Sequence, residues 1–167
     1  MSMGNATELK EIRQKTREKI LNNIDLVRLV LNDKSINDID ADIQQQLIDN
    51  NVFDFMYVPD IPDEEKQFIT FDMNLISSKD RPANKGVSLY FFIFCHKGII
   101  RDDTGYLRTD LIDELIQDIF NGKDFFGLGD IVCTSDNLLT VGTNYYGRQV
   151  RFETTVINKN YCSGQYG

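Results

Sequence analysis

The sequence has few of the residues that most enzyme and metal sites require. It contains one histidine, His96, and three widely spaced cysteines, Cys95, Cys133 and Cys162, with no CxxC pair, Walker loop or Ser-His-Asp order. Adjacent strand residues point to opposite faces, so Cys95 and His96 cannot act together as nucleophile and base. We therefore expect reduced structural thiols, as in a cytosolic protein, a strand-end or interface role for His96, no metal or cofactor, and no enzymatic activity.

Long apolar runs and an excess of basic residues are also missing. No segment is apolar over the length of a membrane span, and residues 1–19 are polar and charged, so we expect a soluble protein with no membrane partner and no signal peptide. Eighteen basic and 26 acidic residues give a net charge of −8. This balance argues against an extended nucleic-acid interface, which needs a basic surface.

The length and composition favour a single domain. With 41% hydrophobic residues, a chain of 167 residues is long enough to bury one core and short for two. We expect one domain over residues 1–167, with a helical arm at 1–50, an α+β core at 51–160 and a polar tail at 161–167.

The best-defined helix is expected at residues 108–122. Its apolar residues recur at the spacing of one helical stripe: Leu111, Ile112, Leu115, Ile116 and Ile119. We expect Leu111, Leu115 and Ile119 to dock on a sheet and Asp113 to face solvent. Thr109 is the expected N-cap, and Gly122 the expected stop.

Four segments around this helix have the patterns of strands, namely residues 68–75, 87–94, 131–141 and 148–157. The second is apolar on both faces, which predicts a central strand covered by the helix on one side and by the N-terminal helix or another subunit on the other. The predicted fold is α+β: a helical arm followed by a β-β-α-β-β mixed sheet with a helix on one face.

The N-terminal region is predicted to be helical. Asn5 and Glu8 resemble a capping box that opens a long helix, and Asn22-Asn23 is a candidate break within it. A shorter helix is expected within residues 36–51, followed by an acidic connector around Pro59 and Pro62.

Three segments are candidates for contact with other proteins: the basic loop 79–86, the hairpin connection 142–147 with its tyrosine pair, and the tail 161–167. The residues that we expect to bind partners are Arg81, Lys85, Tyr145, Tyr146, Arg148 and Tyr166. Arg81 and Arg148 are expected to meet carboxylates across an interface. The alternatives are an ordinary polar hairpin loop at 79–86 and tyrosine rings that fold back on their own hairpin.

Several runs of residues are similar to those of a known family. They are Asn23 to Val30, Tyr57-Val58-Pro59, Gly105 to Ile112, Phe126 to Gly129 and Tyr145-Tyr146-Gly147-Arg148. Together they resemble the small head-to-tail joining and tail-terminator proteins of long-tailed bacteriophages. The resemblance extends over roughly residues 23–158, and none of its runs is a diagnostic signature.

This resemblance implies a structural protein of the virion neck, assembled in the host cytoplasm. Such proteins form a ring, commonly of six copies, that caps the tail tube and joins it to the head connector. An acidic lumen would let DNA pass without specific binding. The alternatives are a small enzyme or ligand-binding protein that uses a groove beside the loop 101–108, and an acidic adaptor or immunity-type protein.

Overall fold

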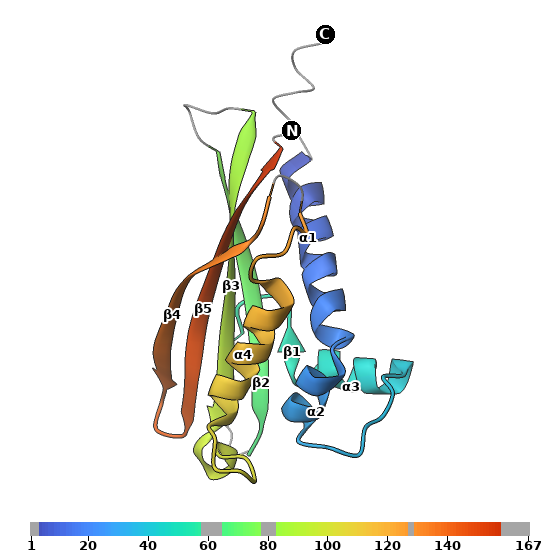
Figure 1. The fold of residues 1–167 in the computed structure, drawn as a ribbon, viewed down its shortest axis with the longest axis vertical. Coiled ribbons are helices and arrows are strands. Elements are labelled where there is room, and N and C mark those ends of the chain that lie inside the picture. Colours follow the sequence, from blue (N-terminus) through green and yellow to red (C-terminus); the bar gives the residue numbers. More distant parts are fainter. Residues whose placement is uncertain (1–3, 58–64, 78–82, 127–128, 158–167) are drawn as a thin grey trace.

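A computed structural model describes residues 4–57, 65–77, 83–126 and 129–157 (Figure 1). The helices are α1 (Gly4–Leu21), α2 (Ile24–Leu31), α3 (Ala41–Asn50), the short 3₁₀ helix η1 (Lys97–Ile99) and α4 (Arg108–Phe120). The strands are β1 (Val52–Phe53), β2 (Gln67–Ser77), β3 (Asn84–His96), β4 (Val132–Val141) and β5 (Tyr145–Ile157). The predicted α+β class is confirmed, and β1 is an addition that the sequence pattern did not predict.

The strands form one mixed sheet in the order β1-β2-β3-β5-β4. The pairs β2–β3, β3–β5 and β5–β4 are antiparallel, and β1 runs parallel to β2. As predicted, β3 is the central strand. After α4 the chain enters β4 at one edge of the sheet and returns as β5, so β5 lies between β3 and β4 (Figure 1).

The main core lies between one face of this sheet and the helices. Its sheet residues include Phe71, Leu89, Phe91 and Phe152, and its helical residues come from α1, α2 and α4. Helix α1 therefore packs on the same face of the sheet as α4. The sequence left two candidates for covering the other face of β3, the N-terminal helix and another subunit, and α1 is not that cover.

Helix α4 docks through a different stripe from the predicted one. Ile112, Ile116 and Phe120 are fully buried, and Phe120 packs against the ring of Phe91. The predicted Leu111, Leu115 and Ile119 stripe is only partly buried. The helix is apolar on two adjacent sides because it contacts both the sheet and α2, and periodicity alone does not say which side is deeper.

Two of the predicted helix N-caps, Thr109 and Asn5, are wrong. Leu107 occupies the N-cap of α4 without a side-chain hydrogen bond, and Thr109 is buried inside the helix. Asn5 lies within α1, so the predicted capping box is wrong. Asn23 does mark the predicted break, since it caps α2 by accepting a hydrogen bond from the Leu26 amide at 2.9 Å.

The opposite face of the sheet carries a smaller aromatic cluster at the end near the β4–β5 turn. Phe68, Phe94 and Tyr145 are almost completely buried there. The stacked rings of Phe68 and Phe94 have centroids 4.9 Å apart, and the Tyr145 ring meets Phe68 edge-on at 5.7 Å. Gly147 permits this packing, because a Cβ at that position would lie 1.9 Å from the carbonyl oxygen of Ile93.

Candidate functional site

Two of the predicted contact residues are core residues. Lys85 is 1% exposed and pairs with Glu8 of α1, with 2.8 Å between Nζ and Oε2. Tyr145 is also 1% exposed, because β5 begins at this residue and the turn is only residues 142–144. The surface roles predicted for these two side chains are therefore wrong.

The other predicted contact residues have different outcomes. Arg81 and Tyr166 lie outside the described residues, as does the tail 161–167. Tyr146 is 45% exposed on β5 and stays available for contact.

Arg148 uses its charge inside its own subunit. Its Nε donates to Asp110 of α4 at 2.8 Å, and its Nη1 pairs with Asp136 of β4 at 2.7 Å. These bonds raise the Arg148 pKa further. The predicted pairing of Arg148 with carboxylates across an interface is thus replaced by an intramolecular link between α4 and β4.

Asp113 of α4 belongs to the same charged cluster and was wrongly expected to face solvent. It is 6% exposed. Burial, and to a smaller extent the neighbouring Asp136, raise the pKa of Asp113 to about 6. The Asp113 carboxyl therefore binds a proton at a higher pH than an ordinary aspartate does.

Strand β4 presents a bare edge. It pairs with β5 on one side, and among the described residues no strand pairs with its other side. Leu138 is 82% exposed on this strand. Leu138 faces Arg148 and Thr140 faces Tyr146 in the register, so Leu138 and Tyr146 are diagonal neighbours on one face.

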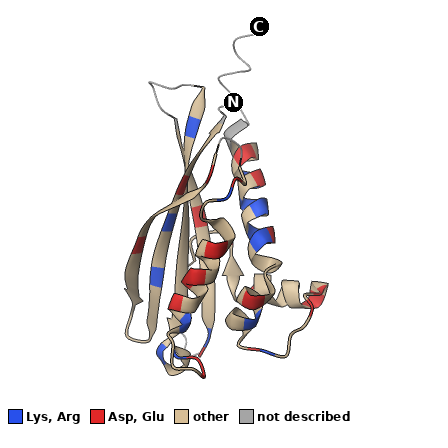
Figure 2. Ribbon diagram, viewed as in Figure 1, with Lys and Arg blue, Asp and Glu red and all other residues tan. Residues whose placement is uncertain are grey.

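A groove lies between α2 and α4 beside the loop that leads into α4. Its volume is about 400 Å³, and its lining includes Leu29, Lys34, Asp102, Arg108, Leu111 and Leu115. This is where the ligand-binding alternative expected a groove. Figure 2 shows acidic positions recurring along α4, so the groove has an acidic rim on that helix.

The Cys95 and His96 side chains do not form a reactive pair. The buried Cys95 thiol has its pKa raised to about 12 by burial, and it lies on the helix-covered face of β3. His96 accepts a hydrogen bond from the Gly98 amide at 3.1 Å and meets the Tyr145 ring edge-on. This is the strand-end role expected for His96.

Within the described part of the chain, no helix is long and apolar enough to cross a membrane. Over the same residues, no cluster of three or more metal-ligating side chains is found.

Comparison with known protein families identifies the family of this chain. A family model described as YomW matches residues 23–154, well over half of the 167 residues. The chain belongs to the YomW family. The match begins at the N-cap of α2 and extends into β5, so both the groove and β4 lie within the YomW region. The family name is that of a phage-derived protein, which is compatible with a phage origin. No match to a curated protein was found.

Sequence reasoning missed two features of this region. Leu138 lies in a segment predicted only as a strand. Adjacent leucines such as Leu138-Leu139 point to opposite faces, but the strand pattern does not say which of the two is exposed. The sequence predicts that a helix begins at Arg108, and no local signal indicates that the Arg108 side chain is buried.

Proposed function

We propose that this YomW-family protein is a structural protein of the phage neck. In this proposal it is a tail terminator or tail completion protein, which forms a ring that caps the tail tube and joins it to the head connector. The observation that carries the proposal is the bare edge of β4. The phage-derived family name supports it, as does the resemblance of the sequence to joining proteins.

The edge of β4 has little of the protection that isolated subunits usually carry. Exposed edge strands are commonly blocked by Lys, Pro or a bulge, because free N–H and C=O groups recruit another strand. The sequence of β4, VCTSDNLLTV, has no Lys or Pro, and its Asp136 is paired with Arg148. A register shift between Cys133 and Ser135 interrupts only the first part of the strand. Residues 135–141 therefore remain open to a neighbour.

The side chains on this edge suit a contact between copies. Leu138 and Tyr146 together form an exposed apolar pair, and aromatic residues are enriched at interface centres. A contact between this pair and a different surface of the next copy is heterologous, so it closes into a ring when the rotation between copies allows. The net charge of −8 suits a lumen through which DNA slides.

The test is deletion of the gene from a phage that carries it, followed by complementation. Deletion should leave DNA-filled heads and free tails that do not join, visible by electron microscopy. Wild-type protein should restore joined particles and plaques. Joined, infectious particles in the deletion strain would show that the protein is not required in the neck and would refute the proposal.

The role of β4 needs a separate, matched pair of variants. Leu138→Lys places a charge on the open edge and should block joining while the subunit stays folded, as judged by circular dichroism. Ile76→Lys changes an equally apolar residue on β2 that is 56% exposed, and it should complement normally. Normal complementation by Leu138→Lys would exclude the β4 edge as an assembly surface.

A further inference from the structure

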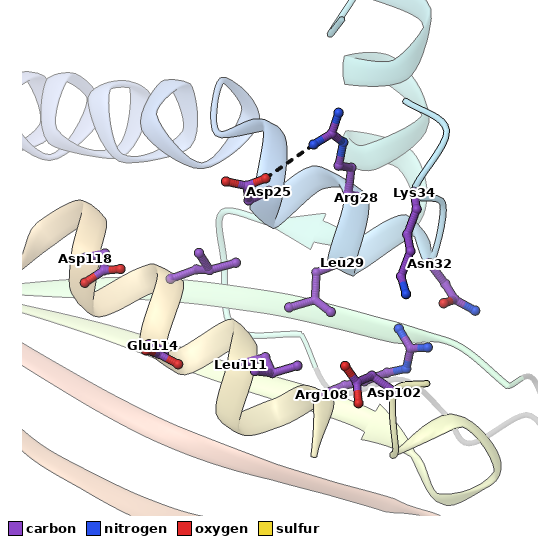
Figure 3. A pocket seen from close by; sticks show the side chains of 11 residues that line it. Asp25, Arg28, Leu29, Asn32, Lys34, Asp102, Arg108, Leu111, Glu114 and Asp118 are labelled. Atoms are coloured by element: carbon purple, nitrogen blue, oxygen red, sulfur yellow. Dashed lines mark hydrogen bonds and ion pairs between the residues drawn. The ribbon is translucent and has the colours of Figure 1, made fainter. Parts of the chain in front are cut away.

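The groove between α2 and α4 has the size and lining of a small-molecule site. Its volume of about 400 Å³ lies in the range typical of ligand pockets. Leu29 of α2 and Leu111 and Leu115 of α4 supply its apolar wall. Figure 3 shows Leu29 and Leu111 between the two helices, with Arg108 and Lys34 towards one end of the groove and Asp118 towards the other.

Arg108 is the feature that points to a ligand. It lines the groove, is 7% exposed, and its buried Nε has no hydrogen-bond partner in the structure as described. Its backbone is fixed, because its amide donates to the Ile100 carbonyl at 2.8 Å. A guanidinium stays charged, and burying one of its N–H groups without an acceptor is unfavourable. An oxyanion in the groove would supply the missing acceptor.

The nearest carboxylate of the lining is already engaged within its loop. Asp102 accepts hydrogen bonds from the amides of Thr104 and Tyr106, both at 2.9 Å, and from the Thr104 hydroxyl. The Thr104 hydroxyl hydrogen bond is the main reason that the pKa of Asp102 is lowered, and the charge of Arg108 contributes only weakly. Asp102 therefore balances part of the charge of Arg108 at a distance without accepting from its Nε.

The remaining charges divide the groove into two ends. Figure 3 shows Lys34 near the Arg108 end, and Glu114 and Asp118 further along α4. Asp25 of α2 is paired with Arg28 of the same helix at 3.5 Å, so these two lining charges largely offset each other. Lys34 pairs with Asp103 at 2.6 Å, but both side chains are about three-quarters exposed, so this pair is easily exchanged for another anion. One end therefore favours an anion, and the other disfavours a second anion.

We propose that this groove binds a small amphipathic anion, which has a single carboxylate or phosphate group and an apolar body. Arg108 and Lys34 bind the oxyanion through charge-assisted hydrogen bonds, and the three leucines contact the apolar body. This site is independent of the neck assignment and of ring formation.

The proposal can be tested on the purified full-length chain with defined probes. Titration of hexanoate and of hexyl phosphate, followed by amide chemical shifts, should saturate with midpoints below about 1 mM. The shifts should map to the residues around Lys34, Arg108 and Leu111. Acetate and inorganic phosphate lack the apolar body, and hexanol lacks the anion, so each should bind at least about tenfold more weakly. The tighter of the first two probes identifies the headgroup.

Three variants test the assigned roles. Arg108→Gln should weaken hexanoate binding at least about tenfold. If that variant does not fold, Lys34→Ala is the substitute, because this exposed side chain can be removed safely; it should weaken binding while Lys15→Ala on the exposed surface of α1 does not. Glu114→Gln should improve binding of the dianion suberate relative to hexanoate.

The outcomes that overturn the proposal are specific. It fails if neither hexanoate nor hexyl phosphate saturates, or if hexanol binds as tightly as hexanoate. It also fails if folded Arg108→Gln, or Lys34→Ala in its place, binds like the wild type. Because these measurements use the isolated chain, a failure here leaves the neck proposal standing, and normal ligand binding does not support that proposal.

Discussion

The buried ion pair between α1 and β3 offers a sharp test of the structure. The side chains of Lys85 and Glu8 are 2% and 6% exposed, and their charged atoms lie 2.8 Å apart. The second oxygen of Glu8, Oε1, has no hydrogen-bond partner within the described residues. This geometry joins the N-terminal helix to the first residues of the central strand, 77 positions later in the sequence.

Removing one partner should be far more costly than removing both. Lys85→Met leaves the Glu8 carboxylate buried without its cation, and breaking such a pair typically costs about 3–5 kcal/mol. That is a large share of the roughly 5–15 kcal/mol of a whole domain. Replacing both partners with Glu8→Leu and Lys85→Met removes the buried charges and should change the stability by less than about 2 kcal/mol.

The assay is urea unfolding of the wild type, both single variants and the double variant at pH 7, followed by circular dichroism. The two single effects and the double effect give the coupling energy of the pair, which should exceed about 2 kcal/mol. Single variants that each cost less than about 0.5 kcal/mol would show that the pair is solvated and that α1 does not dock as described.

Three further predictions concern packing and protonation. Ile116→Ala should cost about 2–5 kcal/mol in urea unfolding and Leu115→Ala less than half of that, because only Ile116 is fully buried; the reverse order would restore the predicted stripe. Tyr145→Ala should cost about 3 kcal/mol or more, whereas Tyr146→Ala should stay within about 0.5 kcal/mol, and equal effects would contradict the start of β5 at Tyr145. Since the pKa of Asp113 is raised to about 6 in the folded state, its protonation stabilises the protein fully below about pH 4, and that stabilisation is lost as the pH rises through 6. Asp113→Asn should flatten this part of the pH profile of unfolding, and an unchanged profile would mean that Asp113 titrates normally.

The sequence by itself determined the order and type of the main elements. The helix at 108–120, the central apolar strand, the final hairpin and the break at Asn22-Asn23 follow from periodicity and capping, which depend on residues close in the chain. The opposed faces of Cys95 and His96 follow from strand geometry in the same way. Because these signals depend only on neighbouring residues, the elements can be predicted without knowledge of the tertiary contacts.

Only the tertiary structure decided which side chains are available for function. From the sequence, Lys85 is expected on the surface, but in the fold it is buried and paired with Glu8 of α1. Tyr145 is expected in a turn, but it starts β5, where Gly147 allows close approach to the backbone of β3. Arg108 is buried because α2, some 80 residues earlier, forms the opposite wall of the groove. The burial and pairing of these residues arise from contacts between segments that are distant in the sequence. Local sequence patterns do not predict which distant segments come into contact.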